Sequence, residues 1–366
     1  MKTLPLPKGS NGSTSGCKPW WVSIGVHRPH TEYRVPIGFY GADLYPGDVV
    51  KPPAHPSAPE GSPFMSGNWQ GGDIADIAHG CRDCIIPANR SVEYRRAYYA
   101  AVSWADHSLG RAVAKLESLG ADVVAKTIVL FHSDHGYQLG ELNEWSKKTD
   151  TELAVHVPLM MRVPWKASSV GQRTTVKAEL VDIYRTLADL AELTNVDPVI
   201  ETSVQGSSLA AAFDSPTTPP ALLANKRAYS QIGRCSCGTY CSGFEVNNMA
   251  QGYQPCDASH AGPPRVHECG GNACCQIPQS QFDYMGYTMR TVDRRFTAWV
   301  PWNNLTLRVE WNNTQAMGLE LFDLAADTGR DFDFAGYSTN VAQDSANAKE
   351  VADLLADLHA EVDTWY

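Results

Sequence analysis

One stretch, residues 127–164, constrains the fold more than any other part of the chain. It opens with the apolar run 127–131 (TIVLF) and closes with a second apolar run, 157–163 (VPLMMRV). Short runs rich in Val, Ile and Leu are typical of strands inside a sheet. We therefore predict two neighbouring strands joined by a charged loop. In open parallel sheets, ligands bind where the strands reach their carboxyl ends.

Polar residues follow the first run directly, as Ser133-Asp134-His135-Gly136. Glycine permits a tight turn, so Asp134 and His135 would project from the end of the strand. A carboxylate suits a hard divalent cation, and an imidazole can add a ligand or a hydrogen bond. The alternative is that these residues form only a polar turn.

The charged loop adds Lys147, a mobile positive charge. A cation together with a lysine suits a charged ester, because negative charge shifts onto the leaving oxygen during cleavage. The alternative for Lys147 is an ordinary solvated loop lysine.

A second polar segment follows the apolar run 19–26 (PWWVSIGV), which predicts another buried strand. It reads His27-Arg28-Pro29-His30. Two imidazoles and a guanidinium just past a strand indicate an anion site, although a polar loop is the alternative. An imidazole at His27 could bind an oxyanion oxygen or protonate a leaving alcohol.

These motifs resemble the sulfatases of the alkaline phosphatase superfamily, and within them the iduronate-2-sulfatase group. The matching segments follow one order and spacing: 25–30, 133–136, 139–141, 144–147, 156–159, 181–187, 285–299 and 320–324. The resemblance implies an α/β fold with an alkaline-phosphatase-like sheet sandwiched by helices. It also implies that Asp134 and His135 bind Ca²⁺, and that His27 and Lys147 contact the sulfate as catalytic and substrate-binding residues.

The function implied by the resemblance is a sulfuric ester hydrolase that removes sulfate from a sulfated sugar or glycosaminoglycan. One alternative is an inactive relative that binds sulfated carbohydrate. Another is a phosphate or phosphonate ester hydrolase of the same superfamily, but the matches at His27 and Lys147 favour sulfate.

Two family features are absent from the sequence. Sulfatases carry a Cys/Ser-x-Pro-x-Arg motif, whose first residue becomes the formylglycine nucleophile, and an Asp pair that completes the calcium site. Neither the motif nor an Asp-Asp pair occurs in the 366 residues. We therefore expect an N-terminally truncated sulfatase fold, a fragment that is inactive when expressed alone.

Composition along the chain predicts three parts. Residues 1–18, rich in Gly, Ser and Pro, predict a disordered leader. Residues 19–215 predict a partial catalytic domain, with helices at 91–119 and 176–193 from apolar residues spaced by three and four. Residues 216–366 predict a smaller α+β subdomain, with a β-hairpin at 284–302, a strand at 320–324 and a helix at 346–366.

The number and spacing of the cysteines indicate the cellular compartment of the protein. Seven of the ten cysteines lie between Cys235 and Cys275, and Cys81 and Cys84 form a separate pair. Their irregular spacing favours a disulfide-stapled insertion over a zinc site. Asn-x-Ser/Thr triplets occur at Asn11, Asn89, Asn304 and Asn312. Together these features favour a secreted, lysosomal or periplasmic glycoprotein, although the chain shows no signal peptide.

Charge and hydropathy exclude other partners. The net charge of −10 argues against nucleic acid and against an anionic membrane surface. No apolar run reaches the roughly 20 residues of a membrane span. The expected partner is a sulfated carbohydrate or another sulfate ester.

Overall fold

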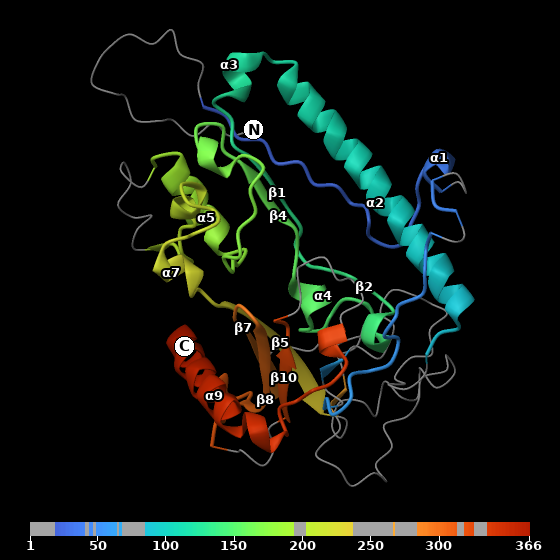
Figure 1. The fold of residues 1–366 in the computed structure, drawn as a ribbon, viewed down its shortest axis with the longest axis vertical. Coiled ribbons are helices and arrows are strands. Elements are labelled where there is room, and N and C mark those ends of the chain that lie inside the picture. The colour runs from blue at the N-terminus through green and yellow to red at the C-terminus, as the bar shows by residue number, and fades with distance from the viewer. Residues whose placement is uncertain are drawn as a thin grey trace.

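The computed structural model describes ten segments: residues 19–40, 44–46, 49–63, 66–67, 85–193, 203–236, 266–267, 284–312, 318–325 and 335–366. The predicted leader, 1–18, lies outside them, as do Cys81, Cys84 and the side chains of the clustered cysteines. The disulfide prediction therefore stays a prediction. In the first part of the chain a long helix runs beside a small sheet, and the second part is a larger sheet covered by a helix (Figure 1).

The long helix is α2 (Ala88–Glu117), which confirms the helix predicted at 91–119. It begins three residues earlier than predicted because Pro87 precedes it, and a fixed proline φ is already suited to a helix start. Ala100, Ala101 and Ala105 are buried on its inner face. The helix ends before Gly120, whose φ of 104° is readily adopted only by glycine. A short helix, α3 (Ala121–Val124), follows.

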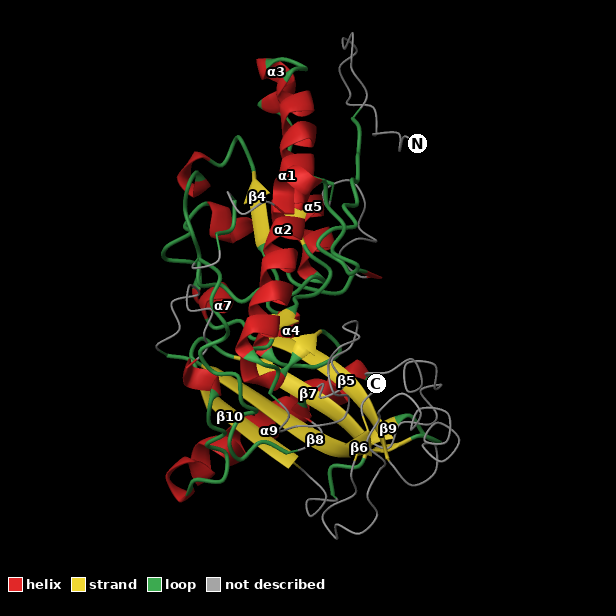
Figure 2. Cartoon of the chain, turned by 90° about the vertical axis from the view of Figure 1, so that its right-hand side faces the viewer, coloured by secondary structure: helices red, strands yellow, loops and turns green. Residues whose placement is uncertain are grey.

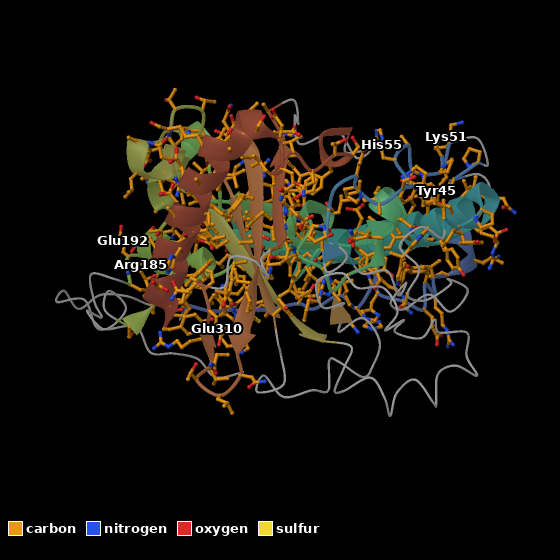
Figure 3. All side chains as sticks on the ribbon, turned by 90° about the horizontal axis from the view of Figure 1, so that it is seen from below. Tyr45, Lys51, His55, Arg185, Glu192 and Glu310 are labelled. Carbon is orange, nitrogen blue, oxygen red and sulfur yellow. The ribbon has the colours of Figure 1, made fainter. Side chains whose placement is uncertain are left out.

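The irregular segment ahead of α2 packs along that helix. It contains the short helix α1 (Ile37–Tyr40). Tyr45, Lys51 and His55 lie on the side of the molecule where α2 runs (Figure 3). The Tyr45 hydroxyl donates to the carbonyl of Tyr99 in α2 over 3.0 Å, and the His55 carbonyl accepts from the amide of Leu142 over 2.7 Å. The segment therefore connects α2 to the charged loop.

The two apolar runs of residues 127–164 form β1 (Val129–His132) and β4 (Leu159–Arg162). They are neighbours, as predicted, but they pair antiparallel, with His132 opposite Leu159. A parallel pair needs a crossover that carries the chain back to its starting end. Here the intervening residues return the chain from the same end, which gives an antiparallel pair, so the general rule about open parallel sheets does not apply to these two strands.

The strand predicted at residues 19–26 is also wrong. The segment has no strand assignment, and the side chains of Trp20 and Trp21 are 50% and 72% exposed. A strand needs a neighbour for its backbone hydrogen bonds, and no ladder joins this segment to the other described residues. The segment is apolar, but no strand among the described residues pairs with it.

The charged loop between β1 and β4 has its own structure. It contains the two-stranded hairpin β2 (Gln138–Leu139) and β3 (Trp145–Ser146), with the 3₁₀ turn η2 (Glu141–Asn143) between them. It ends in the single-turn helix α4 (Glu152–Val155). Trp145 is buried against Leu139 and aromatic residues of α2, so the hairpin has its own apolar anchor.

Two shorter regions complete the first part. Helix α5 (Asp182–Leu190) is shorter than the helix predicted at residues 176–193. Residues 176–181 and 191–193 lie outside it. Asp182 is buried and pairs locally with Lys226, 3.0 Å away. The remaining short elements are η3 (Ala167–Ser169), η4 (Ala210–Phe213) and α7 (Ala221–Ala224).

The second part is an antiparallel sheet in the order β10-β8-β7-β5-β6, with β9 paired to β8 (Figure 2). Its strands are β5 (Ala228–Ser236), β6 (Val266–His267), β7 (Tyr284–Arg290), β8 (Arg294–Asn303), β9 (Arg308–Val309) and β10 (Gly318–Asp323). The hairpin predicted at 284–302 and the strand predicted at 320–324 are confirmed by β7, β8 and β10.

One face of this sheet is the main apolar core. Helix α9 (Ala348–Val362) lies across it. Three 3₁₀ turns flank this helix in the sequence: η9 (Ala335–Tyr337), η10 (Ser345–Asn347) and η11 (Asp363–Trp365). Phe296, Leu321 and Leu358 are fully buried between sheet and helix. Alternate strand residues share a face, so the apolar positions of β8 and β10 meet α9. The C-terminal helix prediction is confirmed.

The opposite face of the sheet mixes polar groups with buried aromatic side chains such as Trp299 and Phe322, and it packs on the charged loop, where Phe322 meets Leu142. Glu152 of α4 is buried between two arginines of the sheet, with 3.2 Å to Arg290 and 3.5 Å to Arg295. Burial alone would raise the pKa of Glu152. The hydrogen bond from His156 and the charges of Arg295 and Arg290 outweigh it, so the pKa falls to about 2. This ion pair cluster joins the two parts of the chain. Among the described helices, none has the length and apolarity that a bilayer crossing requires.

Glu152→Gln should destabilise the fold by about 3 kcal/mol, because it leaves buried arginine charge uncompensated. The pKa of Glu152 in the folded protein lies below the usual glutamate value of 4.5, so the stabilisation is present above pH 4.5 and is lost as the pH falls toward 2. Urea denaturation at pH 7 and pH 3 measures both effects.

Glu350→Gln is the matched control, since Glu350 pairs with Arg294 at a more exposed position, where the two side chains are 38% and 25% exposed. We expect it to change the free energy of unfolding by less than about 1 kcal/mol. Equal losses of unfolding free energy in the two variants would contradict the stabilising role assigned to the buried Glu152.

Candidate functional site

The site is built on the β2–β3 hairpin. Gln138 pairs with Ser146, so Lys147, the next residue, lies at the end of the hairpin where the chain arrives from Asp134. Residue 136 must be a glycine because the backbone of Leu153 approaches it closely. Its amide donates to the carbonyl of Ala154 over 2.7 Å, and an added Cβ would meet backbone atoms of Leu153. The turn after β1 is thus held against α4.

A buried ion pair fixes the hairpin to α2. Arg95 of α2 donates to Glu141 over 2.8 Å, and both side chains are less than a tenth exposed. The second carboxylate oxygen of Glu141 accepts from the amide of Leu139 over 2.7 Å. Burial raises the pKa of Glu141, and the charge of Arg95 opposes that rise. Because the pair is buried, it is less screened by solvent and salt than a surface pair.

Lys147 reaches the other polar segment that the sequence singled out. Its Nζ lies 3.1 Å from Nε2 of His30, although the two residues are 117 positions apart. The ring of His30 stacks on that of His27, with centroids 5.2 Å apart. Nη1 of Arg28 lies 2.8 Å from Nδ1 of His27. Two imidazoles, a guanidinium and an ammonium therefore form one cluster, which we call the imidazole cluster.

Asp134 and His135 form a separate pair at the end of β1. The amide of His135 donates to Oδ1 of Asp134 over 3.0 Å, and Nε2 of His135 lies 3.6 Å from Oδ2. Slight burial acts to raise the pKa of Asp134, but the charge of His135 and hydrogen bonds to the carboxylate lower it overall. The Asp134 side chain is 84% exposed. An ionised, accessible carboxylate is what a cation ligand requires.

A pair of tyrosines connects these two groups. Tyr33, three residues after His30, hydrogen-bonds through its hydroxyl to that of Tyr137 over 2.8 Å. Tyr137 lies between the Asp134 turn and the hairpin, and its ring stacks on Tyr98 of α2 at 4.9 Å. The segment with the histidines is therefore held beside the turn with the carboxylate.

The structure thus places Lys147 with the histidine segment and keeps Asp134 with His135. The sequence did not predict the contact between His30 and Lys147, although His30 lies in the same motif as His27. The link through Tyr137 was missed too, since a lone tyrosine between two motifs carries no recognisable signal.

The residues fit a metal ion in part. Calcium takes six to eight oxygen ligands, and Asp134 supplies one carboxylate. Nε2 of His135 points toward Asp134, while its Nδ1 lies 2.9 Å from the carbonyl of Gly136. Within the described segments no group of three or more His, Cys, Asp or Glu side chains gathers around a metal-sized space. These segments therefore contribute part of a ligand set.

The sulfatase family model matches residues 14–193. The chain is therefore similar to sulfatases over just under half of its length, which we call the sulfatase segment. The match includes all four predicted site residues: His27, Asp134, His135 and Lys147.

Relatives extend the likeness beyond this sulfatase segment. Iduronate 2-sulfatase of Homo sapiens is 28% identical over 337 residues, which cover 79% of this chain and 53% of that protein. Arylsulfatase K of Danio rerio is 39% identical over 190 residues, covering 52% of this chain and 30% of that protein. The chain thus spans about half the length of the human relative.

A solved structure shows the same fold. The phosphonate monoester hydrolase of Silicibacter pomeroyi superposes with a TM-score of 0.59 at 18% identity, covering 91% of this chain and 54% of that one. At this identity the likeness supports the α/β fold class of the sulfatase segment and does not define its substrate.

Arg95→Gln should destabilise the protein by about 3 kcal/mol, because Glu141 then loses its buried partner. The hairpin that carries Lys147 should lose protection against amide hydrogen exchange. Arg90→Gln is the control on the same helix, as Arg90 pairs with Glu93 at an exposed position and should change stability by about 0.5 kcal/mol or less. Similar hydrogen exchange in both variants would refute the anchoring role.

Proposed function

We propose that this chain forms part of a sulfuric ester hydrolase of the iduronate-2-sulfatase type, which removes sulfate from a sulfated sugar or glycosaminoglycan. The observation that carries the proposal is the contact between Lys147 and His30, which brings Lys147 and His27 into one cluster. The match of residues 14–193 to the sulfatase family model supports the same chemistry.

The imidazole cluster would bind the sulfate group. The ammonium of Lys147 and an N–H of His27 would donate to sulfate oxygens, since charge-assisted hydrogen bonds are the stronger kind. His27 would also donate a proton to the leaving alcohol oxygen. Asp134 and His135 would contribute to a Ca²⁺ site, and such an ion would supply positive charge near the ester.

Two other functions are compatible with parts of this picture. A sulfatase-like protein without turnover would bind sulfated carbohydrate through the same residues. A phosphate or phosphonate ester hydrolase is compatible with the fold shared with the phosphonate monoester hydrolase, but that likeness does not choose between sulfate and phosphate. Parallel titrations with inorganic sulfate and phosphate discriminate the last case, because a sulfatase site should prefer sulfate.

We further propose an oxidising compartment for the protein: secreted, lysosomal or periplasmic. The support is the density of cysteines between Cys235 and Cys275, since cysteine-rich segments of this kind persist as disulfides outside the reducing cytosol.

Lys147→Ala should weaken the binding of inorganic sulfate about tenfold, as expected for loss of one charge-assisted hydrogen bond. Isothermal titration at constant ionic strength measures the dissociation constant. Lys126→Ala, which removes an exposed lysine after α3, should leave it unchanged. Unaltered binding by the Lys147 variant would contradict the proposed site.

The chain by itself should hydrolyse no aryl sulfate, because its sequence carries no Cys/Ser-x-Pro-x-Arg motif. Release of the phenol from an aryl sulfate, followed by absorbance, measures this directly. Turnover that scales with protein concentration and disappears in Lys147→Ala would show that another residue serves as nucleophile.

A further inference from the structure

We propose that Arg28 and His30 are positioning residues of the imidazole cluster. Arg28 fixes the ring proton of His27 on Nε2, and His30 holds the ammonium of Lys147. The inference rests on the proposed function for its consequence, oxyanion binding. The hydrogen-bond assignment itself depends only on the geometry of the cluster.

The tautomer of His27 follows from the chemistry of its neighbour. A guanidinium can donate hydrogen bonds but cannot accept them. Nη1 of Arg28 lies 2.8 Å from Nδ1 of His27, so Nδ1 must accept and the ring proton lies on Nε2. Arg28 is itself oriented by backbone, because its Nε donates to the carbonyl of Arg34 over 2.7 Å and its Nη1 to that of His30 over 3.3 Å.

The tautomer of His30 is the opposite one. An ammonium also only donates, so Nε2 of His30 accepts from Lys147 at 3.1 Å. The ring proton then lies on Nδ1, which is 2.7 Å from the carbonyl of Thr31 and can donate to it. Both nitrogens of His30 are therefore engaged, one by the lysine and one by the backbone.

The two assignments give each residue a distinct task. The stacked rings, inclined by 18°, each carry one proton, so the positive charge of the cluster resides on Arg28 and Lys147. The Nε2–H of His27 can donate to an oxygen of a bound oxyanion. His30 restricts the long, flexible side chain of Lys147, which reduces the conformational entropy lost when an anion binds.

Nuclear magnetic resonance of the full chain labelled with ¹⁵N-histidine tests the tautomers. Long-range ¹H–¹⁵N correlations distinguish a ring protonated on Nδ1 from one protonated on Nε2. We expect the Nε2–H form for His27 and the Nδ1–H form for His30. In Arg28→Gln the preference of His27 should weaken while that of His30 persists. A wild-type His27 in the Nδ1–H form, or an unaffected His27 in Arg28→Gln, overturns the proposal.

Titration with inorganic sulfate tests whether His30 positions the ammonium of Lys147. His30→Ala should weaken binding nearly as much as Lys147→Ala, and the double variant should be no weaker than Lys147→Ala alone, because the residues act as a unit. His30→Gln offers an acceptor oxygen and should retain affinity within about threefold. Wild-type affinity in His30→Ala, or losses that multiply in the double variant, overturns the positioning role.

Controls separate this proposal from the proposed function. His107→Ala removes an exposed histidine on α2 and should change neither the tautomers nor sulfate affinity. Urea denaturation establishes that each variant is folded. If the wild-type chain binds no sulfate while both tautomers are as assigned, the proposed function fails and the hydrogen-bond assignment stands.

Discussion

The arrangement depends on Glu152, a carboxylate buried between Arg290 and Arg295. Removing three charged groups from water is costly, and the cost is offset only when the charges meet in good geometry. That requirement permits one placement of α4 against the sheet. The buried cluster therefore specifies how the charged loop sits on the second part of the chain, in addition to any stability that it adds.

The same loop is held from its other side by Arg95 and Glu141. Between these two buried contacts lies the hairpin that carries Lys147. The supporting charges are buried, whereas the predicted site residues are half-buried or exposed. This division suits a binding site, because the scaffold is rigid while the side chains that would meet a ligand stay accessible.

In the larger sheet, alternate residues of one strand pack against two different neighbours, α9 on one side and the charged loop on the other. In β8 the apolar residues Phe296, Ala298 and Val300 face α9, and the alternate positions Arg295, Thr297 and Trp299 face the charged loop. A strand alternates its faces residue by residue. Both sides of this sheet are therefore covered, one by an apolar core and the other by paired polar groups together with buried aromatic side chains.

Much of the fold could be predicted because the relevant signals are local. The apolar spacing of α2 and α9 and the alternation of β7 and β8 depend on neighbouring residues alone. The motifs around His27, Asp134, His135 and Lys147 likewise identified the segments from which the candidate site is built. Their assigned roles are proposals that rest on chemistry and on family likeness.

The tertiary structure decided what depends on partners. An apolar run indicates a strand but does not name its neighbour, so residues 19–26 have no ladder and β1 and β4 run antiparallel. The contact of Lys147 with His30 spans 117 positions and cannot be read from either motif. By itself the sequence determined which polar motifs are candidates for the site and where most of the regular helices and the β7–β8 hairpin lie. Which of these groups touch was settled only when distant segments packed together, because hydrogen bonds and ion pairs act over a few ångströms in space.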